Sequence, residues 1–278
     1  MEFRDFGKTG VKVSVIGMGT YYDPQWIVLS RIGITPSKER RIQALRTGLE
    51  GGINFIDTAE LYNTEDLVAE AIKNYDREKL FIATKVWPSH LKYNSLIKAA
   101  KNSLKRLKTK YIDLYQIHFP SRTVPIEESM RAMEKLVDDG MIRFIGVSNF
   151  NLEQLKKAQN SLKKYEISSI QMPYSLVDRR IENDIIPYAK ENKIAVICYY
   201  PLGHGRLAKQ FPSDAVDLIR KNHGERTFAQ IALNWIISKH DNTFPIPRAS
   251  NPVHVKENLD AVGWRLSPEE IENLEKYF

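Results

Sequence analysis

Short apolar runs alternate along the chain with longer amphipathic stretches. Several of the runs, such as FIAT at 81–84 and IAVICYY at 194–200, are apolar at nearly every position. Strands of this kind are buried on both faces, as in parallel sheets. The pattern predicts strands at residues 13–19, 53–57, 80–84, 112–117, 143–147, 168–171, 195–199 and 244–246.

Helical periodicity fills the stretches between these runs. In the segment 97–108, four apolar residues recur at intervals typical of one helix stripe, and four lysines repeat that spacing on another face. No aromatic residues interleave with the lysines, so we interpret them as a solvated outer face rather than a nucleic-acid site. Asn151 with Gln154, and Ser267 with Glu270, predict capping boxes at two helix starts.

Eight strand–helix units of about 25 to 40 residues predict an α/β fold, a closed (β/α)₈ TIM barrel rather than an open sheet. Residues 3–13 predict an N-terminal β-hairpin that covers the barrel bottom. No linker interrupts the pattern, so we expect residues 1–278 to form one domain. Two stretches exceed ordinary loops and are expected to carry function: 21–36, and 203–242 with helical parts at 214–220 and 228–239.

Composition places the chain among soluble globular proteins. It is 42% hydrophobic and 27% charged, which excludes disordered and fibrous classes. Cys198 is the lone cysteine, the N-terminus is charged, and no apolar run reaches the ~20 residues of a spanning helix. We therefore expect a cytoplasmic protein with no membrane partner. The net charge of +7 allows an acidic or phosphorylated ligand.

Four ionisable residues close or follow three successive predicted strands: Asp57, Tyr62, Lys85 and His118. The C-terminal strand ends of a barrel meet at one rim, so these side chains are expected to converge. An ammonium near a phenol lowers its pKa, and Asp57 would keep Lys85 charged. With a neutral His118 orienting a carbonyl, Tyr62 becomes a candidate proton donor to a carbonyl that receives a hydride. The alternative is a structural Asp57–Lys85 ion pair beside ordinary rim residues.

The chain resembles aldo-keto reductases over essentially its whole length. The resemblance rests on DTAELYN, ATKVW, YIDLYQIHFP, IRFIGVSNF, IQMPYSL, CYYPLGHGRL and IPRASNPVHVKEN, in this order. It implies that Asp57, Tyr62, Lys85 and His118 are a catalytic tetrad in which Tyr62 is the general acid. The implied activity is reversible reduction of aldehydes or ketones with NADPH.

The resemblance also implies a set of NADP-binding residues. Those for the nicotinamide end are Ser148, Asn149, Gln171 and Tyr199, whose ring would stack on the nicotinamide. Those for the pyrophosphate and adenosine end are Leu202, Gly203, Gly205, Arg206, Arg248, Ser250, Asn251, His254, Glu257 and Asn258. His254 stands where the family often has an arginine, so NAD in place of NADP stays possible.

The implied substrate pocket is aromatic, with Tyr21, Trp26, Trp87 and Phe119 in its walls. Loop packing is an equal alternative for Trp26. The histidines show no metal-binding spacing, so no metal is expected. The expected partner is a small carbonyl compound, with the protein a monomer or weak oligomer. Two other functions stay open: an NAD-preferring alcohol or sugar dehydrogenase, and a cofactor-sensing binding protein related to potassium-channel β subunits.

Overall fold

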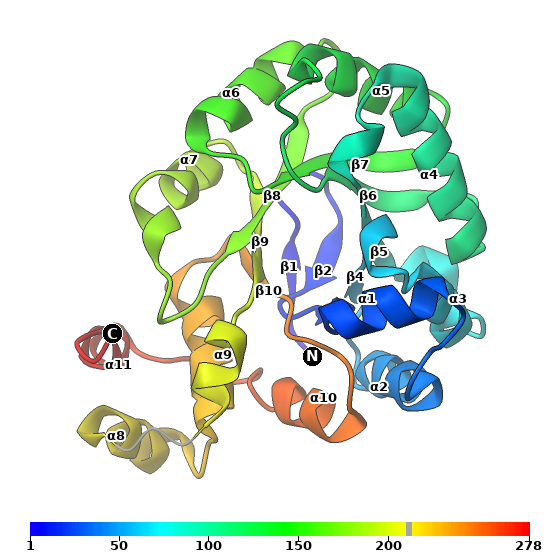
Figure 1. Cartoon of the computed structure of the whole chain (residues 1–278). Helices are drawn as coiled ribbons and strands as arrows, with labels where there is room; N and C mark the ends of the chain where they lie inside the picture. The colour runs from blue at the N-terminus through cyan, green and yellow to red at the C-terminus, as the bar shows by residue number, and fades with distance from the viewer. Residues whose placement is uncertain (210–212) are drawn as a thin grey trace.

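The computed structural model describes residues 1–209 and 213–278. In these residues eight parallel strands form one sheet, each paired with its neighbour in chain order. Figure 1 shows the strands at the centre with the helices around them. The strands are β3 (Met18–Gly19), β4 (Phe55–Asp57), β5 (Phe81–Val86), β6 (Ile112–Ile117), β7 (Ile142–Ser148), β8 (Ile167–Pro173), β9 (Ala195–Tyr199) and β10 (Thr243–Pro245).

Backbone hydrogen bonds between the first and last strands close the sheet. The Gly17 N–H donates to Pro245 O, and the Gly19 N–H donates to Pro247 O, both at 2.9 Å. The Ala249 N–H returns a bond of the same length to Gly19 O. The predicted (β/α)₈ barrel is therefore confirmed.

The predicted N-terminal hairpin is also confirmed. It consists of β1 (Phe3–Asp5) and β2 (Lys12–Ser14), paired antiparallel. Between them Phe6 is fully buried, with its ring centroid 4.7 Å from that of Phe81 and 5.1 Å from that of Phe244. The hairpin thus closes the bottom of the barrel, as expected.

The predicted strand at 13–19 is the one that departs most from the structure, whereas the bounds of the others agree to within two residues. The apolar run at 13–19 was expected to form a single barrel strand, but Val13 and Ser14 belong to β2 of the hairpin. Only Met18 and Gly19 join the barrel sheet. The residues between these two strands are as apolar as the strands themselves, so the hydrophobic pattern does not mark the break.

The helices that follow the barrel strands pack around the outside of the sheet. Both predicted capping boxes are present, at the starts of α6 and α11. The four lysines of the segment 97–108 are exposed, which agrees with a solvated face. The helices are α2 (Lys38–Glu50), α3 (Glu65–Ile72), α4 (Tyr93–Leu107), α5 (Ile126–Asp138), α6 (Leu152–Ser161), α7 (Ile185–Glu191), α9 (Phe228–Lys239), α10 (Pro252–Leu259) and α11 (Pro268–Glu275).

The two long stretches contain more helix than expected. Residues 21–36 include α1 (Pro24–Arg31), in which Asp23 caps the N-terminus and Pro24 takes the first position. Residues 203–242 contain the 3₁₀ segment η5 (Gly203–Ala208), α8 (Asp214–His223) and α9, while positions 210–212 of this stretch lie outside the described residues. No helix in the described ranges is both long and apolar enough to span a membrane.

Candidate active site

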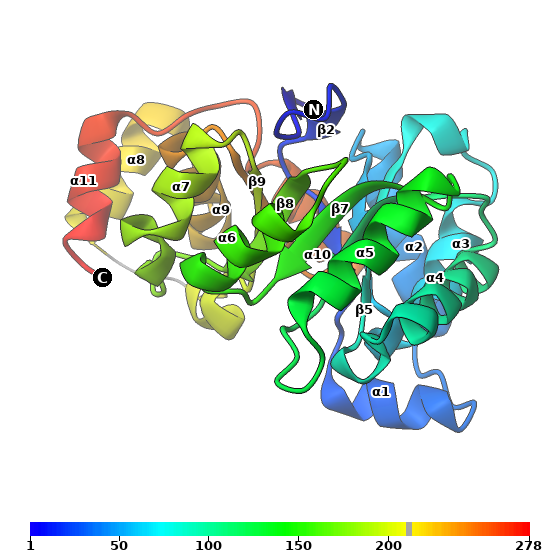
Figure 2. The same cartoon turned by 90° about the horizontal axis from the view of Figure 1, so that it is seen from above.

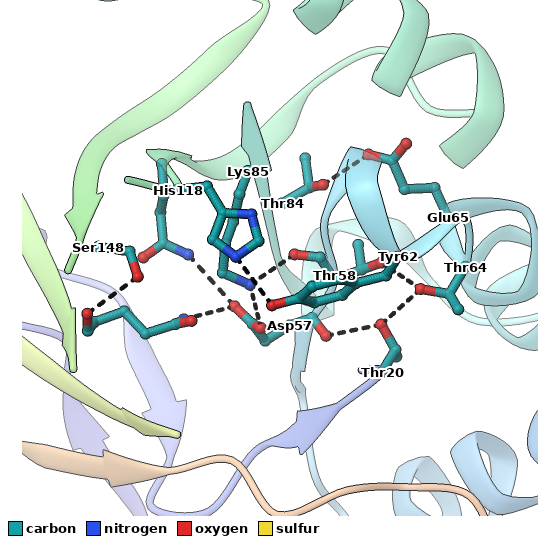
Figure 3. Close-up of polar contacts among 12 residues, drawn as sticks. Thr20, Asp57, Thr58, Tyr62, Thr64, Glu65, Thr84, Lys85, His118 and Ser148 are labelled. Atoms are coloured by element: carbon teal, nitrogen blue, oxygen red, sulfur yellow. Dashed lines mark hydrogen bonds and ion pairs between the residues drawn. The ribbon is translucent and has the colours of Figure 1, made fainter. Parts of the chain in front are cut away.

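The side-chain alternation of the strands brings Asp57 and Lys85 into the barrel. Phe55 on β4 and Phe81 on β5 belong to the cluster that fills the barrel interior. Asp57 and Lys85 lie two and four residues further along these strands, so they point to the same side at the upper rim. There the Lys85 Nζ donates to Asp57 Oδ2 at 2.5 Å and to Thr58 O at 2.8 Å (Figure 3). Both residues are buried.

Two glutamine side chains complete the environment of the Asp57 carboxylate. Gln171 Nε2 donates to Asp57 Oδ1 at 2.8 Å, and Gln116 Nε2 donates to the same oxygen at 3.3 Å. Both carboxylate oxygens therefore have partners, as a buried charge requires. Gln116 was not among the predicted site residues. Its position on β6, two residues before His118, is the period-two signal that would have found it.

Tyr62 and His118 meet above this ion pair. The Tyr62 hydroxyl lies 3.2 Å from His118 Nε2, within hydrogen-bond distance. Tyr62 comes from the 3₁₀ segment η1 (Glu60–Tyr62), directly after β4, and its ring centroid is 4.9 Å from the Lys85 Nζ. The structure thus brings all four predicted catalytic residues into one cluster (Figure 3).

The pKa values in this cluster follow from burial. Burial, and next the negative charge of Asp57, raise the pKa of Tyr62 well above its usual value. Burial lowers the pKa of Lys85, while the Asp57 carboxylate opposes that shift. The expected lowering of the Tyr62 pKa by Lys85 is therefore not found, because Asp57 balances the lysine charge and the phenol is desolvated. Tyr62 is protonated at neutral pH.

His118 is neutral at physiological pH, as expected. Burial, and then the positive charge of Lys85, lower its pKa to about 2. The Asn149 Nδ2 donates to the backbone oxygen of His118 at 2.9 Å and fixes the end of β6. The neutral ring can therefore form a hydrogen bond to a ligand, either as donor or as acceptor, without becoming charged.

A cavity of about 830 Å³ opens above the cluster, and Tyr62 and His118 form part of its floor. Its walls near them are aromatic: Tyr21, Trp87, Phe119, Tyr199 and Tyr200. Tyr200 was not predicted, although it directly follows the predicted residue Tyr199 in the sequence.

Trp26 was expected to line the substrate pocket, but the cavity lining does not include it. The side chain is only 1% exposed, and its Nε1 donates to the backbone oxygen of Tyr62 at 3.2 Å. The expectation that Trp26 lines the pocket is therefore wrong, and the alternative, that it packs within its loop, agrees with the structure.

A polar wall lies beside Tyr62 at the ends of β7, β8 and β9. The Tyr199 hydroxyl donates to Asn149 Oδ1 at 2.7 Å, and the Ser148 Oγ donates to Gln171 O at 3.1 Å. These residues, with their amide groups and one aromatic ring, all belong to the cavity lining. From there the lining continues through Leu202, Gly205, Arg248, Ser250, His254, Glu257 and Asn258.

Three predicted cofactor residues lie outside the lining. Asn251 accepts a hydrogen bond from the Val253 N–H and caps α10. Gly203 has a backbone φ of +54°, and a Cβ there would meet Val177 Cγ2 at 2.6 Å, so packing requires its glycine. Arg206 is exposed on η5.

The shape and chemistry of the cavity fit a nicotinamide dinucleotide. The amide-rich wall and the Tyr199 ring suit a flat ring that carries a carboxamide. Gly205 has a φ of +88° with open space at its Cβ position, so a ligand can approach the backbone closely. The exposed Arg248, also in the lining, supplies a guanidinium that suits a phosphate.

Comparison with known proteins agrees with this site. The model of the "Aldo/keto reductase family" matches residues 16–277. The aldo-keto reductase YhdN of Bacillus subtilis (strain 168) is 31% identical, over 99% of this chain and 92% of its own length. The methylglyoxal reductase YeaE of Escherichia coli (strain K12) is 34% identical, over 96% of this chain and 92% of its own.

A solved structure shows the same fold. The crystal structure of an aldo/keto reductase from Klebsiella pneumoniae, in complex with NADP and acetate, has a TM-score of 0.85 and 32% sequence identity. The match covers 100% of this chain and 95% of that one. On these grounds the chain belongs to the aldo/keto reductase family of oxidoreductases.

Proposed function

We propose that this protein reduces aldehydes or ketones with NADPH and that Tyr62 donates the proton. The observation that carries the proposal is the contact between the Tyr62 hydroxyl and His118 Nε2 at 3.2 Å, above the buried Lys85–Asp57 pair and on the cavity floor. Both groups are neutral at physiological pH, so both can form hydrogen bonds to one uncharged carbonyl oxygen.

NADPH supplies a hydride to the carbonyl carbon when it is bound. The cofactor assignment is supported by the fit of the cavity and by the Klebsiella relative, whose crystal structure contains NADP. In this chain Ser148, Asn149 and Gln171 would hold the carboxamide, and the ring of Tyr199 would support one face of the nicotinamide.

Tyr62 and His118 act on the oxygen of the substrate. Their hydrogen bonds align the carbonyl group and stabilise the negative charge that develops on its oxygen. The Tyr62 O–H then breaks, and its proton passes to that oxygen to give the alcohol. Because the pKa of Tyr62 is raised, the phenol is protonated before the reaction. The alkoxide that forms is a strong enough base to take this proton. Lys85 stabilises the resulting phenolate through its positive charge.

The substrates we propose are small aldehydes, including 2-oxoaldehydes and aromatic aldehydes. The Escherichia coli relative is a methylglyoxal reductase. The walls formed by Tyr21, Trp87 and Phe119 also suit flat apolar groups.

The test is NADPH oxidation, followed by absorbance, with methylglyoxal and with an aromatic aldehyde. Tyr62→Phe removes only the hydroxyl, so we expect kcat to fall by about 10²- to 10⁴-fold while the Kd for NADPH, measured by fluorescence, stays unchanged. Tyr21→Phe is a matched control, because its ring lies 5.2 Å from that of Tyr62 on the same cavity wall. Turnover by Tyr62→Phe equal to that of the unmodified chain would show that Tyr62 is not the proton donor.

A cytoplasmic location completes the proposal. Cys198 is a free cysteine, buried inside β9, and burial raises the pKa of its thiol. Such a cysteine is inert and needs no oxidising compartment.

A further inference from the structure

Helix α1 and the turn after it carry apolar side chains that face solvent. Val28 is 64% exposed, Ile32 is 70% exposed and Ile34 is 51% exposed. Val28 and Ile32 are four residues apart, at the end of the helix and its C-cap, so they lie on one face. Isolated exposed apolar residues are common, but a cluster of this kind marks a contact surface.

The opposite face of α1 holds the helix on the protein. Its buried residues are Trp26 and Ser30, and Trp26 also binds the backbone of Tyr62. Figure 2 shows α1 at the outside of the molecule, on the opposite side of the barrel from the N-terminal hairpin. The exposed apolar face is therefore presented on a protruding helix and is not part of a groove.

Exposed basic residues neighbour the apolar ones in the sequence. Arg31, Lys38 and Arg40 are exposed, and none of them forms an ion pair within residues 1–209 and 213–278. By contrast, the neighbouring Arg41 is buried and lies 3.7 Å from Asp23. The segment 24–40 contains one acidic residue, Glu39. This segment thus combines apolar groups with an excess of basic over acidic side chains, in a chain whose net charge is +7.

Contrary to the expectation of no membrane partner drawn from the sequence, we propose that residues 24–40 dock on an anionic lipid bilayer. The side chains of Val28, Ile32 and Ile34 would enter the headgroup region, and the three basic residues would pair with lipid phosphates. A second copy of the chain fits less well, because a symmetric contact brings these like charges together. Three side chains also cover far less than the roughly 800 Å² per partner of a stable interface.

Docking in this way would place the active-site cavity beside the lipid. Asp23 and Pro24 line the cavity at the point where α1 begins. The chain has no candidate membrane span in its described parts, so the attachment we propose is peripheral and reversible.

The test is co-sedimentation of the full chain with vesicles. We expect binding to vesicles of phosphatidylglycerol and phosphatidylcholine, with a partition coefficient about tenfold higher than for phosphatidylcholine alone or in about 0.5 M salt. Val28→Ser with Ile32→Ser, and separately Lys38→Gln with Arg40→Gln, should each lower the partition coefficient by about tenfold. Because these four side chains are exposed and do not line the cavity, Tm and NADPH turnover should not change.

Matched controls come from other faces of the molecule. Phe3→Ser removes an exposed apolar residue from the hairpin, and Lys98→Gln with Lys101→Gln removes two exposed charges from α4. Both controls should bind vesicles like the unmodified chain. No binding to the anionic vesicles, or an equal loss in the controls, would overturn the proposal. Self-association abolished by Val28→Ser, without vesicle binding, would assign the surface to a second copy instead.

Discussion

The neutral state of His118 makes the stability of the protein depend on pH. Its pKa in the folded state is about 2, whereas a histidine in an unfolded chain has a pKa of about 6.5. Between these values the unfolded chain binds a proton that the folded chain does not, so the free energy of unfolding falls as the pH drops. At pH 5 this loss is on the order of 2 kcal/mol. His118→Gln should remove it, as measured by chemical denaturation at pH 7 and pH 5.

Another histidine contributes to the same measurement. Burial also lowers the pKa of His240. His240 therefore makes the free energy of unfolding fall as the pH drops, both in the unmodified chain and in His118→Gln. His118→Gln therefore keeps the part of the pH dependence that His240 contributes. If His118→Gln shows the same pH dependence as the unmodified chain, His118 takes up its proton in the folded state over the same pH range as in the unfolded chain.

Arg248 should decide between the two nicotinamide cofactors. It is an exposed residue of the cavity lining, and its Nη1 donates to Tyr22 O at 2.8 Å. If it binds the adenosine 2′-phosphate, Arg248→Ala should raise the Kd for NADPH by about 10- to 100-fold and change that for NADH much less. Fluorescence titration with both cofactors checks this, with Lys256→Ala as a control outside the cavity lining. An equal rise in the Kd for NADPH and for NADH would mean that Arg248 positions the surrounding loop and does not bind the 2′-phosphate.

The catalytic residues could be predicted because strand alternation and strand ends are local features. Lys85 follows Phe81 and Ala83 at period two, so its inward direction follows from the sequence. The pKa of Tyr62 could not be predicted in the same way. Its direction depends on how strongly the phenol is desolvated and on how fully Asp57 balances Lys85, and both are properties of long-range packing.

At the scale of elements, α1 shows what a pattern of apolar residues misses. Asp23 and Pro24 form a helix-start signal that was available in the sequence. The helix is only 8 residues long, and the apolar Val28 shares its exposed face with polar residues, so the usual division into a buried apolar and an exposed polar face is blurred. Its buried face is specified by long-range contacts, since Trp26 lies beneath Arg41, whose Cζ is 4.0 Å from the centre of the indole ring.

The same contacts predict a catalytic effect for Trp26. In Trp26→Phe the backbone oxygen of Tyr62 loses its indole donor, so the turn that carries the Tyr62 hydroxyl should become less well fixed. We expect kcat to fall several-fold, the Kd for NADPH to stay unchanged, and the free energy of unfolding to fall by about 1–3 kcal/mol. Steady-state kinetics, cofactor titration and chemical denaturation measure the three quantities.

Trp235→Phe is the matched control for this change. Trp235 is as fully buried, and its Nε1 donates to Glu275 Oε1 at 2.8 Å, in contact with α11 rather than with Tyr62. Its loss should lower stability by a similar amount while kcat stays unchanged. If both variants lose kcat equally, Trp26 acts through general stability and not through the position of Tyr62.

At the scale of the whole molecule, the barrel separates stability from chemistry. The bottom is closed by the rings of Phe6, Phe55, Phe81 and Phe244, whereas the catalytic cluster lies at the other end of the strands. The fold class follows from the repeated strand–helix units in the sequence. The closure does not, because the bonds that join β3 to the β10 region link residues more than 200 positions apart.

Phe6→Ala tests this separation directly. Phe6 is fully buried, so truncation leaves a cavity and should lower the free energy of unfolding by about 3–5 kcal/mol. The cavity would lie next to the ring of Phe81, and Lys85 lies four residues further along the same strand toward the rim, so kcat/KM below the melting range should stay within about twofold. Phe3→Ala on the same hairpin removes an exposed ring and should change stability by less than about 0.5 kcal/mol. A loss of kcat/KM in Phe6→Ala at temperatures where the protein is still folded would mean that packing at the bottom does control the geometry at the rim.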